Sequence, residues 1–262
     1  MICDCLTIIV PNYNKCDFLE DCINSIFTQT LIPKQVIVVD DKSTDDSLLI
    51  LNKLKEKYNN LLIIPLQENK GVSNARNAGI LACQTKYVSF LDSDDFIFNP
   101  RKIENEMRLM KNSTNKLIYS NYIKVNENGG VLEPNKKYYN FLNLRGMCFG
   151  KIQSVNSLVY GPFNFIVATD LVKRVGCYSF PLNLYEDYDL LIRLSKVCRF
   201  VPTNEIGYAY RFTPNGLSKA KLEEHKKALA IIKNTYYQHP SFGHKIQWFF
   251  RRVLLKIFRN KI

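Results

Sequence analysis

The residues Phe90-Leu91-Asp92-Ser93-Asp94-Asp95 are the stretch around which the chain is organised. They place three carboxylates directly after an apolar run. That run, residues 87–91, has the length and composition of a buried strand. Carboxylates at the end of a buried strand repel one another and lose solvation unless a positive charge lies among them. A hard divalent cation with oxygen ligands, completed by substrate phosphates, meets that need. A solvated Asp-rich turn before a helix that begins near Pro100 is the alternative.

Strands and helices alternate on the amino-terminal side of this stretch. Apolar runs at residues 6–10, 35–39 and 61–66 predict three further strands. Apolar residues at helical spacing predict helices over residues 17–28, 43–58 and 71–83. This alternation is typical of βαβ units around a mainly parallel sheet flanked by helices, which places the chain in the α/β class.

Polar side chains follow the predicted strands where each strand ends. Ligands of parallel sheets bind beyond the carboxyl ends of the strands, which share one edge of the sheet. We therefore expect a single binding site at that edge. The residues that would meet there are Tyr13, Asp40, Asp41, Asp92 and Asp94.

The second half of the chain is less regular. Residues 116–125 and those from Val131 onward flank the turn sequence at 126–130, Asn-Glu-Asn-Gly-Gly, which predicts a β-hairpin. Residues 163–175 fit either a strand or a helix, and 200–201 and 207–212 predict two short strands. Glu186 and Asp187 precede an apolar helical pattern, and acids in the first turn of a helix are favoured on electrostatic grounds alone.

Composition restricts the class of protein. The chain has 262 residues and eight cysteines, none of them spaced as Cys-x-x-Cys, which favours reduced thiols in the cytosol over a disulfide framework or a zinc site. Its amino-terminal residues predict no secretory signal, and no apolar run is long enough to span a bilayer. The formal charge of +12 predicts an acidic partner, such as nucleic acid, anionic lipid or a phosphorylated small molecule.

The composition changes again after Ser218. Residues 222–237 predict a helix, and residues 245–262 predict a second one that is both amphipathic and basic. A basic helix with an apolar face that includes Trp248 suits an anionic membrane surface. A helix docked on the protein's own core is the alternative. The basic residues of this segment include Arg251, Arg252, Lys256, Arg259 and Lys261.

Five motifs taken together resemble the GT-A-type family 2 glycosyltransferases, particularly the inverting enzymes that build bacterial surface polysaccharides. The resemblance implies a GT-A, Rossmann-like catalytic domain over residues 1–217 and a helical extension over residues 218–262. The matching stretches are Val-Pro-Asn-Tyr-Asn at 10–14, Val-Val-Asp-Asp-Lys-Ser-Thr-Asp at 38–45, Asn-Lys-Gly at 69–71 with Ala-Arg-Asn-Ala-Gly at 75–79, the Asp-rich stretch at 90–95, and Glu186-Asp187.

The resemblance implies that several of these residues bind the donor nucleotide. Pro11 and Tyr13 would line the pocket for the base, with the Tyr13 ring near the face of the base. Asp41 would accept a hydrogen bond from a base N–H, as expected for uracil, while Asp40 would orient the same loop. Asp92 would approach the ribose. The remaining positions assigned to the nucleotide are Ser93, Arg76 and Arg211.

One of these assignments carries an alternative, and another departs from the family pattern. Arg76 would lie near the nucleotide or would pair with an acidic residue. Arg211 would meet the diphosphate, although Thr213 stands where a histidine is frequent in the family.

The resemblance also implies a metal ligand and a base. Asp94 would coordinate Mn²⁺ or Mg²⁺ bridging the donor diphosphate. Asp187 would deprotonate the acceptor hydroxyl, with Glu186 in support. A single displacement inverts the anomeric configuration, and it needs a base on the side of the donor opposite the metal. The implied donor is a nucleotide sugar, expected to be a UDP-sugar, and the implied acceptor is a glycan or a lipid-linked saccharide at the inner face of the cytoplasmic membrane.

Two other classes of protein compete with this interpretation. A sugar-phosphate nucleotidyltransferase would carry a Gly-rich loop with an arginine after the first strand, where this chain has Pro-Asn-Tyr-Asn-Lys at 11–15. A nucleic-acid-binding protein would account for the positive charge, but the basic excess is strongest in the terminal segment and no known binding motif is present. We therefore expect an enzyme without a nucleic-acid partner.

Overall fold

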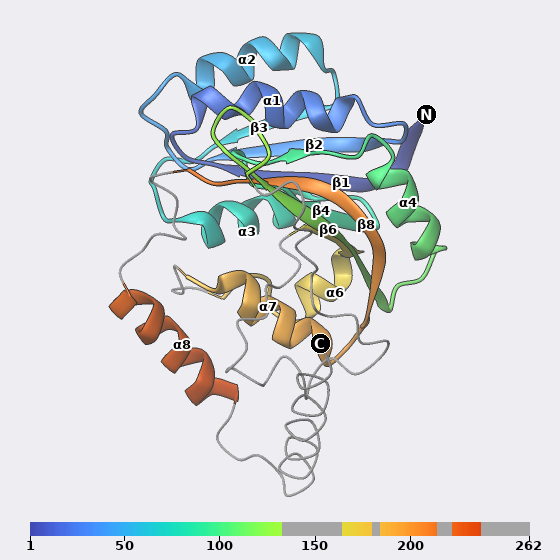
Figure 1. Ribbon diagram of the computed structural model, residues 1–262, viewed down its shortest axis with the longest axis vertical. Coiled ribbons are helices and arrows are strands. Elements are labelled where there is room, and N and C mark those ends of the chain that lie inside the picture. The colour runs from blue at the N-terminus through green and yellow to red at the C-terminus, as the bar shows by residue number, and fades with distance from the viewer. Residues whose placement is uncertain (133–163, 180–183, 214–221, 237–262) are drawn as a thin grey trace, which may run out of the picture.

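The computed structural model describes residues 1–132, 164–179, 184–213 and 222–236 (Figure 1). Its centre is an eight-stranded sheet with the strand order β3-β2-β1-β4-β7-β6-β8-β5. The first four strands in this order run parallel to one another, as the alternation of strands and helices predicts. They are β3 (Leu61–Pro65), β2 (Ile32–Asp40), β1 (Ile2–Asn12) and β4 (Tyr87–Phe90).

Helices cover both faces of this parallel half. In Figure 1, α1 (Cys16–Phe27) and α2 (Ser47–Lys57) lie on one face of the sheet and α3 (Val72–Ala82) lies on the other. The strands are accordingly buried on both sides, and Val36, Val38 and Phe90 are almost fully inaccessible to solvent. Gly79 lets α3 approach β1 closely, because a Cβ atom at this position would lie 2.5 Å from Cγ2 of Ile9.

Helix α2 begins four residues later than the predicted start at Ser43, because the residues before it bind the neighbouring loop. The backbone N–H and the hydroxyl of Ser43 both donate to Asp40. The backbone N–H of Thr44 donates to Oδ1 of Asn14 at 2.7 Å, and Asp45 accepts from the backbone N–H of Cys16 at 3.0 Å. These side chains and amides stabilise a loop instead of a first helical turn.

The other half of the sheet is mixed. Strand β7 (Phe165–Ala168) runs antiparallel to β4 and to β6 (Lys116–Val125), while β8 (Arg199–Arg211) runs parallel to β6 and antiparallel to β5 (Phe96–Ile97). The prediction of two short strands at 200–201 and 207–212 is wrong. Pairing with β6 resumes after two register shifts near Asn121, so that β8 continues as one strand.

Two ambiguous predictions are also resolved. Residues 163–175 contain both of the alternatives, since β7 is followed directly by α6 (Thr169–Arg174). The predicted hairpin is present as a tight turn in which the N–H of Asn126 donates to the carbonyl of Gly130 at 2.8 Å. Its second arm makes one bridge, between Val131 and Val125, before the described residues end at 132.

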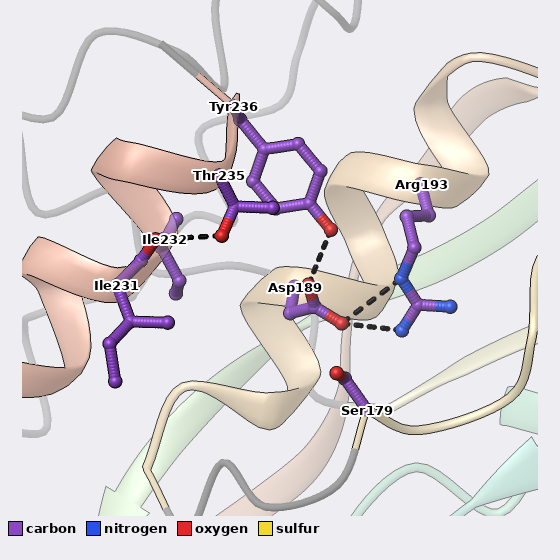
Figure 2. A pocket seen from close by; sticks show the side chains of 7 residues that line it. All are labelled: Ser179, Asp189, Arg193, Ile231, Ile232, Thr235 and Tyr236. Carbon is purple, nitrogen blue, oxygen red and sulfur yellow. Dashed lines mark hydrogen bonds and ion pairs between the residues drawn. The ribbon is translucent and has the colours of Figure 1, made fainter. Parts of the chain in front are cut away.

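The described residues also form α4 (Lys102–Met110), α7 (Glu186–Ser195) and α8 (Leu222–Tyr236). Helix α8 packs against α7, and its Ile232 is a buried member of the main hydrophobic core. Figure 2 shows Tyr236 of α8 and Arg193 of α7 both directed at Asp189. These three residues line a cavity of about 220 Å³. The division at residues 217 and 218 stays a prediction, and the basic segment at 245–262 lies outside the described residues.

Candidate active site

The carboxyl ends of three neighbouring strands meet at one edge of the sheet. Strand β1 lies between β2 and β4, and Asn12 at the end of β1 is paired with Asp40 at the end of β2. The backbone N–H of Asp41 donates to the carbonyl of Asn12 at 2.8 Å. On the other side, the N–H of Leu91 donates to the carbonyl of Ile9 at 3.1 Å. This register brings the loops after β1, β2 and β4 together, as the sequence predicts.

The loop after β2 holds two buried carboxylates in fixed positions. Asp40 accepts hydrogen bonds from Nδ2 of Asn12 at 2.8 Å and from the Ser43 hydroxyl at 2.6 Å. Asp41 accepts from the backbone N–H groups of Lys70 at 3.1 Å and Gly71 at 2.7 Å. A carboxylate offers about four acceptor positions, so the Asp41 oxygens retain capacity for a further donor.

The residues predicted to contact the base differ in exposure. Pro11 is buried at the end of β1, whereas 45% of the Tyr13 surface remains accessible to solvent. An exposed aromatic ring beside the buried carboxylates of Asp40 and Asp41 provides a face on which a planar base can stack. The geometry is compatible with the predicted base pocket.

The Asp-rich stretch separates its carboxylates. Oδ1 of Asp92 accepts from Nη2 of Arg76 at 2.6 Å, and Oδ2 of Asp94 pairs with Nζ of Lys15 at 2.7 Å. Both side chains are partly exposed at the edge of the sheet. Asp95 instead turns inward, where burial and the charges of Asp94 and Asp92 raise the pKa of its carboxyl group well above the ordinary range. Ser93, between the partly exposed Asp92 and Asp94, is buried.

Arg211 supports this stretch from behind. Its guanidinium group is nearly inaccessible to solvent and lies against the rings of Phe18 and Phe96. Nε donates to the backbone carbonyl of Asp94 at 2.7 Å, while Nη2 pairs with Asp21 at 3.2 Å. Nη1 contacts the backbone carbonyl of Glu127. The predicted contact with the diphosphate stays a prediction, and the interactions of Arg211 in the structure hold the loop that carries Asp94.

Helix α7 brings the second pair of acids to the same region. Oε1 of Glu186 accepts from Nη1 of Arg76 at 2.7 Å. The same guanidinium binds Asp92, so Arg76 joins the Asp-rich stretch to the start of α7. Tyr185, directly before Glu186, has φ 62°, a strained conformation for a bulky residue, and its hydroxyl is 3.1 Å from Nδ1 of His225 in α8. Strain of this kind is typical of functional sites.

Asp187 has the electrostatic character of a general base. Burial, and after it the charge of the neighbouring Glu186, raise the pKa of its carboxyl group to about 7, while the Arg76 cation opposes the shift. Oδ1 accepts a hydrogen bond from the N–H of Tyr188 at 2.7 Å. A base works best when its pKa lies close to the operating pH, so this carboxylate is suited to accept a proton near neutrality.

The carboxylates fit a cation that is held partly by its substrate. Among the residues described, no group of three or more His, Cys, Asp and Glu side chains is arranged to enclose a metal ion. Asp94 nevertheless presents a hard oxygen ligand at the edge of the sheet, where Lys15 already places a positive charge. Mg²⁺ commonly uses one or two carboxylates together with substrate phosphates and water, which matches this arrangement.

Sequence reasoning missed two contributors to the site. Lys15 belongs to the loop after β1, and its ion pair with Asp94 has no signature in local spacing. The ring of Tyr178 has its centre 5.0 Å from the Arg76 guanidinium, and no motif points to this residue. An aromatic residue shortly before an acidic pair that opens a helix was the available signal.

Comparison with known proteins agrees with this geometry. The sequence profile described as Glycosyl transferase family 2 matches residues 7–171, more than half of the chain. The chain therefore belongs to glycosyl transferase family 2. This confirms the resemblance to family 2 glycosyltransferases, and the motifs at the three strand ends fall inside the matched range.

Individual relatives cover different shares of their own length. The UDP-Glc:α-D-GlcNAc-diphosphoundecaprenol β-1,3-glucosyltransferase WfaP of Escherichia coli is 29% identical over 238 residues, which is 87% of this chain and 86% of WfaP. The hyaluronan synthase of Pasteurella multocida is 26% identical over 246 residues, or 90% of this chain. The chain spans only 24% of that synthase.

A solved structure confirms the GT-A fold. The crystal structure of residues 1–349 of TarS from S. aureus, in complex with UDP, superposes with a TM-score of 0.65 at 21% identity. The match covers 87% of this chain and 64% of the TarS chain.

Proposed function

We propose that this protein is an inverting glycosyltransferase that moves a sugar from a UDP-sugar to a hydroxyl group of a glycan or of a lipid-linked saccharide during surface-polysaccharide synthesis. The observation that carries the proposal is the convergence of the Asp-rich stretch and α7. Asp92 and Glu186 bind the same guanidinium, and Asp187, with a pKa of about 7, follows Glu186 directly. Family membership supports the reaction class.

The loops after β1 and β2 would bind the nucleotide. The exposed ring of Tyr13 would stack on the base, and Asp41 would accept a hydrogen bond from the base N–H with its remaining capacity. Asp40, which is bound by Asn12 and Ser43, would keep the loop in place. Asp92 and Ser93 would lie toward the ribose at the end of β4.

Asp94 would hold Mn²⁺ or Mg²⁺ on the diphosphate side of the donor. When bound, such a cation neutralises the diphosphate and makes the nucleotide a better leaving group. Arg211 would support this step indirectly, since its side chain binds the backbone carbonyl of Asp94 and its backbone N–H donates to Oδ1 of the buried Asp95 at 2.8 Å. Lys15 must release Asp94 or accompany it toward the phosphates.

Asp187 would remove the proton from the acceptor hydroxyl as that oxygen attacks the anomeric carbon. The bond between the anomeric carbon and the phosphate oxygen breaks in the same displacement, so the configuration inverts. A carboxylate with a pKa near 7 is partly deprotonated at neutral pH and accepts the proton without a further activating group. Glu186 would keep the start of α7 in place through Arg76.

The acceptor is proposed from the relative WfaP, and the location of the enzyme in the cell from the basic segment at 245–262. The name of WfaP gives its acceptor as a saccharide diphosphate on undecaprenol, which supports a lipid-linked acceptor for this chain too. Within the described residues, no helix has the length and apolar character needed to cross a bilayer. We infer that the basic segment at 245–262 binds the inner face of the cytoplasmic membrane, where such an acceptor would lie.

A donor panel tests the reaction class. Purified protein is incubated with UDP-glucose, UDP-GlcNAc and GDP-mannose, each with Mn²⁺, with Mg²⁺ or with EDTA, and the products are identified. A glycosyltransferase releases UDP from its donor, slowly to water and faster once an acceptor saccharide is supplied. A parallel incubation contains UTP and a sugar phosphate, from which a nucleotidyltransferase would form a nucleotide sugar and release pyrophosphate, and this result would overturn the proposal. An Asp187→Asn variant provides the inactive control.

A further inference from the structure

Two adjacent residues of α3 bind a segment that lies about one hundred positions later. Nδ2 of Asn77 donates to the backbone carbonyl of Tyr178 at 3.0 Å, and the N–H of Tyr178 donates back to Oδ1 of Asn77 at 2.9 Å. This reciprocal pair fixes the backbone of Tyr178 to α3. The position of α3 is itself fixed, since Gly79 on the same helix packs directly against Ile9 of β1.

Arg76 binds the other end of the same segment. Its Nη1 donates to Glu186, the first residue of α7, and its guanidinium lies 5.0 Å from the centre of the Tyr178 ring. Tyr178 and Glu186 are therefore both attached to α3. The third contact of Arg76, from Nη2 to Asp92, joins Tyr178 and Glu186 to the Asp-rich stretch.

A second set of contacts holds α7 independently of Arg76. Asp189 accepts from the hydroxyl of Tyr236 in α8 at 2.5 Å and from Arg193 at 2.5 and 3.0 Å, as Figure 2 shows. Arg193 also donates to the carbonyl of Val175 at 2.6 Å. Helix α8 thus fixes the body of α7, whereas Arg76 fixes the end that carries Glu186 and Asp187.

We propose that Arg76 is a positioning residue that sets the distance between the donor-binding Asp-rich stretch and the base on α7, and that it does not bind the nucleotide. Only 7% of its side chain is exposed, and two of its nitrogens are occupied by carboxylates. A planar guanidinium can bind two carboxylates and stack on a ring at the same time, which the point charge of a lysine cannot do. This inference rests on the proposed function.

Arg76 also contributes charge to the site. The groups that face the Asp187 carboxyl are Glu186, Tyr185, Tyr178, Asp92 and Arg76. Arg76 is the cation in this set, and it favours the ionised form of Asp187 against the repulsion of Glu186 and Asp92. A neutral residue at position 76 would leave that repulsion unopposed, so protonation of the base would persist to higher pH.

The test compares Arg76→Lys and Arg76→Met with Lys102→Met as a matched control. Lys102 is also a buried cation, paired with Glu106 at 2.7 Å, but it lies in α4 away from the site. We expect the affinity of Arg76→Met for UDP with Mn²⁺, measured by calorimetry, to stay within about threefold, whereas its kcat for transfer from the preferred UDP-sugar falls by about 10²-fold, the usual effect of a small misplacement. The midpoint of the rise in kcat/KM with pH should move upward by about one unit or more.

Each variant has a distinct expected result. Arg76→Lys keeps the charge, so the midpoint of its rise in kcat/KM with pH should stay at the wild-type value while its kcat falls. Lys102→Met should lose stability but keep both the midpoint and kcat. A large loss of UDP affinity in Arg76→Met with an unchanged midpoint would show that Arg76 binds the nucleotide, and the proposal would be overturned. Wild-type kcat in Arg76→Lys would overturn it as well.

Hydrogen exchange of the free protein separates this inference from the identity of the base. Amides of residues 184–195 should exchange faster in Arg76→Lys and in Asn77→Ala than in Lys102→Met, without any donor present. Equal exchange in all three variants would contradict the role of Arg76 in positioning α7. If Asp187→Asn retained full transfer, the proposed base would be wrong, while the exchange comparison would still decide the role of Arg76.

Discussion

Oε1 of Glu186 lies 2.7 Å from Nη1 of Arg76, although 110 positions separate the two residues. Only 10% of the Glu186 side chain and 7% of the Arg76 side chain are exposed, so water screens this ion pair weakly. Removing one partner of a buried pair typically costs about 3–5 kcal/mol, because the other charge is left uncompensated. The first residue of α7 is therefore bound by the same cation that binds the Asp-rich stretch.

Replacement of the base should abolish transfer and spare donor binding. Asp187→Asn keeps the size of the side chain and removes its capacity to accept the proton. We expect transfer to fall by roughly 10²–10⁴-fold, the usual contribution of a positioned base. UDP affinity, measured by calorimetry, should barely change. Near-native transfer in this variant would exclude Asp187 and direct attention to Glu186 or Asp189.

The pH dependence should report the same carboxyl group. Its pKa is raised to about 7, so kcat/KM should rise with pH up to about 7 and then level off. Folding shows the opposite trend, because the folded state holds this proton more tightly than the unfolded chain. The contribution of Asp187 to the free energy of unfolding is present at low pH and declines as pH rises through the window up to about 7.

Denaturant unfolding at several pH values measures that contribution. Asp187→Asn removes the titrating group, so its stability should depend less on pH than that of the wild type between about pH 4 and 7. If the free energies of unfolding of the two proteins changed with pH in parallel across this window, the raised pKa of Asp187 would be contradicted.

The parallel half of the fold was predictable because its signals are local. Apolar runs, turn residues and helical spacing mark β1 to β4 and the helices between them, and the shared strand direction then places Asp40, Asp41 and Asp92 at one edge. The mixed half was less predictable. Pairing of β8 with β6 spans more than eighty positions, and the register shifts that keep β8 continuous depend on that partner.

Residue types at the site were predictable, but the contacts between them were not. The sequence predicts acids at strand ends, yet it does not show that Arg76 binds both Asp92 and Glu186 or that Lys15 binds Asp94. These pairings depend on tertiary distances. Arg211 illustrates the same limit. The sequence motif is compatible both with an arginine that binds phosphate and with the buried arginine that the structure shows, which binds the backbone of Asp94.

Asp94 can be tested as the metal ligand. In Asp94→Ala we expect the increase in UDP affinity caused by Mn²⁺ to vanish, because the protein loses its carboxylate oxygen ligand for the cation. Lys15→Met is the matched control, since it removes the other partner of the ion pair and leaves the carboxylate available. Calorimetry with and without EDTA measures both variants. An Mn²⁺ effect of wild-type size in Asp94→Ala would show that the cation binds elsewhere.

Gly79→Ala tests the packing of α3 on β1. Alanine is the better helix former, so the substitution alone would stabilise an exposed helix by about 1 kcal/mol. Here the new Cβ would lie 2.5 Å from Cγ2 of Ile9, inside the core. We expect the free energy of unfolding to fall by about 1–3 kcal/mol from overpacking. Leu81→Ala, at an exposed position of the same helix, is the control. A stabilised Gly79→Ala variant would show that β1 and α3 can separate without cost.

Two truncations separate the roles of the carboxyl-terminal region. Removal of residues 245–262 should abolish sedimentation with anionic vesicles, since each basic residue near such a surface contributes about 1 kcal/mol, screened by salt. UDP affinity and the melting temperature should remain unchanged. Removal of residues 222–262 takes α8 as well, and with it the buried Ile232 and the hydrogen bond from Tyr236 to Asp189.

The longer truncation should therefore melt earlier and lose transfer activity, because α7 loses the hydrogen bond and the apolar contacts that α8 provides. Equal melting temperatures for the two truncated proteins would contradict the packing of α8 as a support of α7. A large loss of stability in the shorter truncation would show that residues 245–262 dock on the catalytic domain. Intact protein that ignores anionic vesicles at low salt would likewise exclude the membrane role.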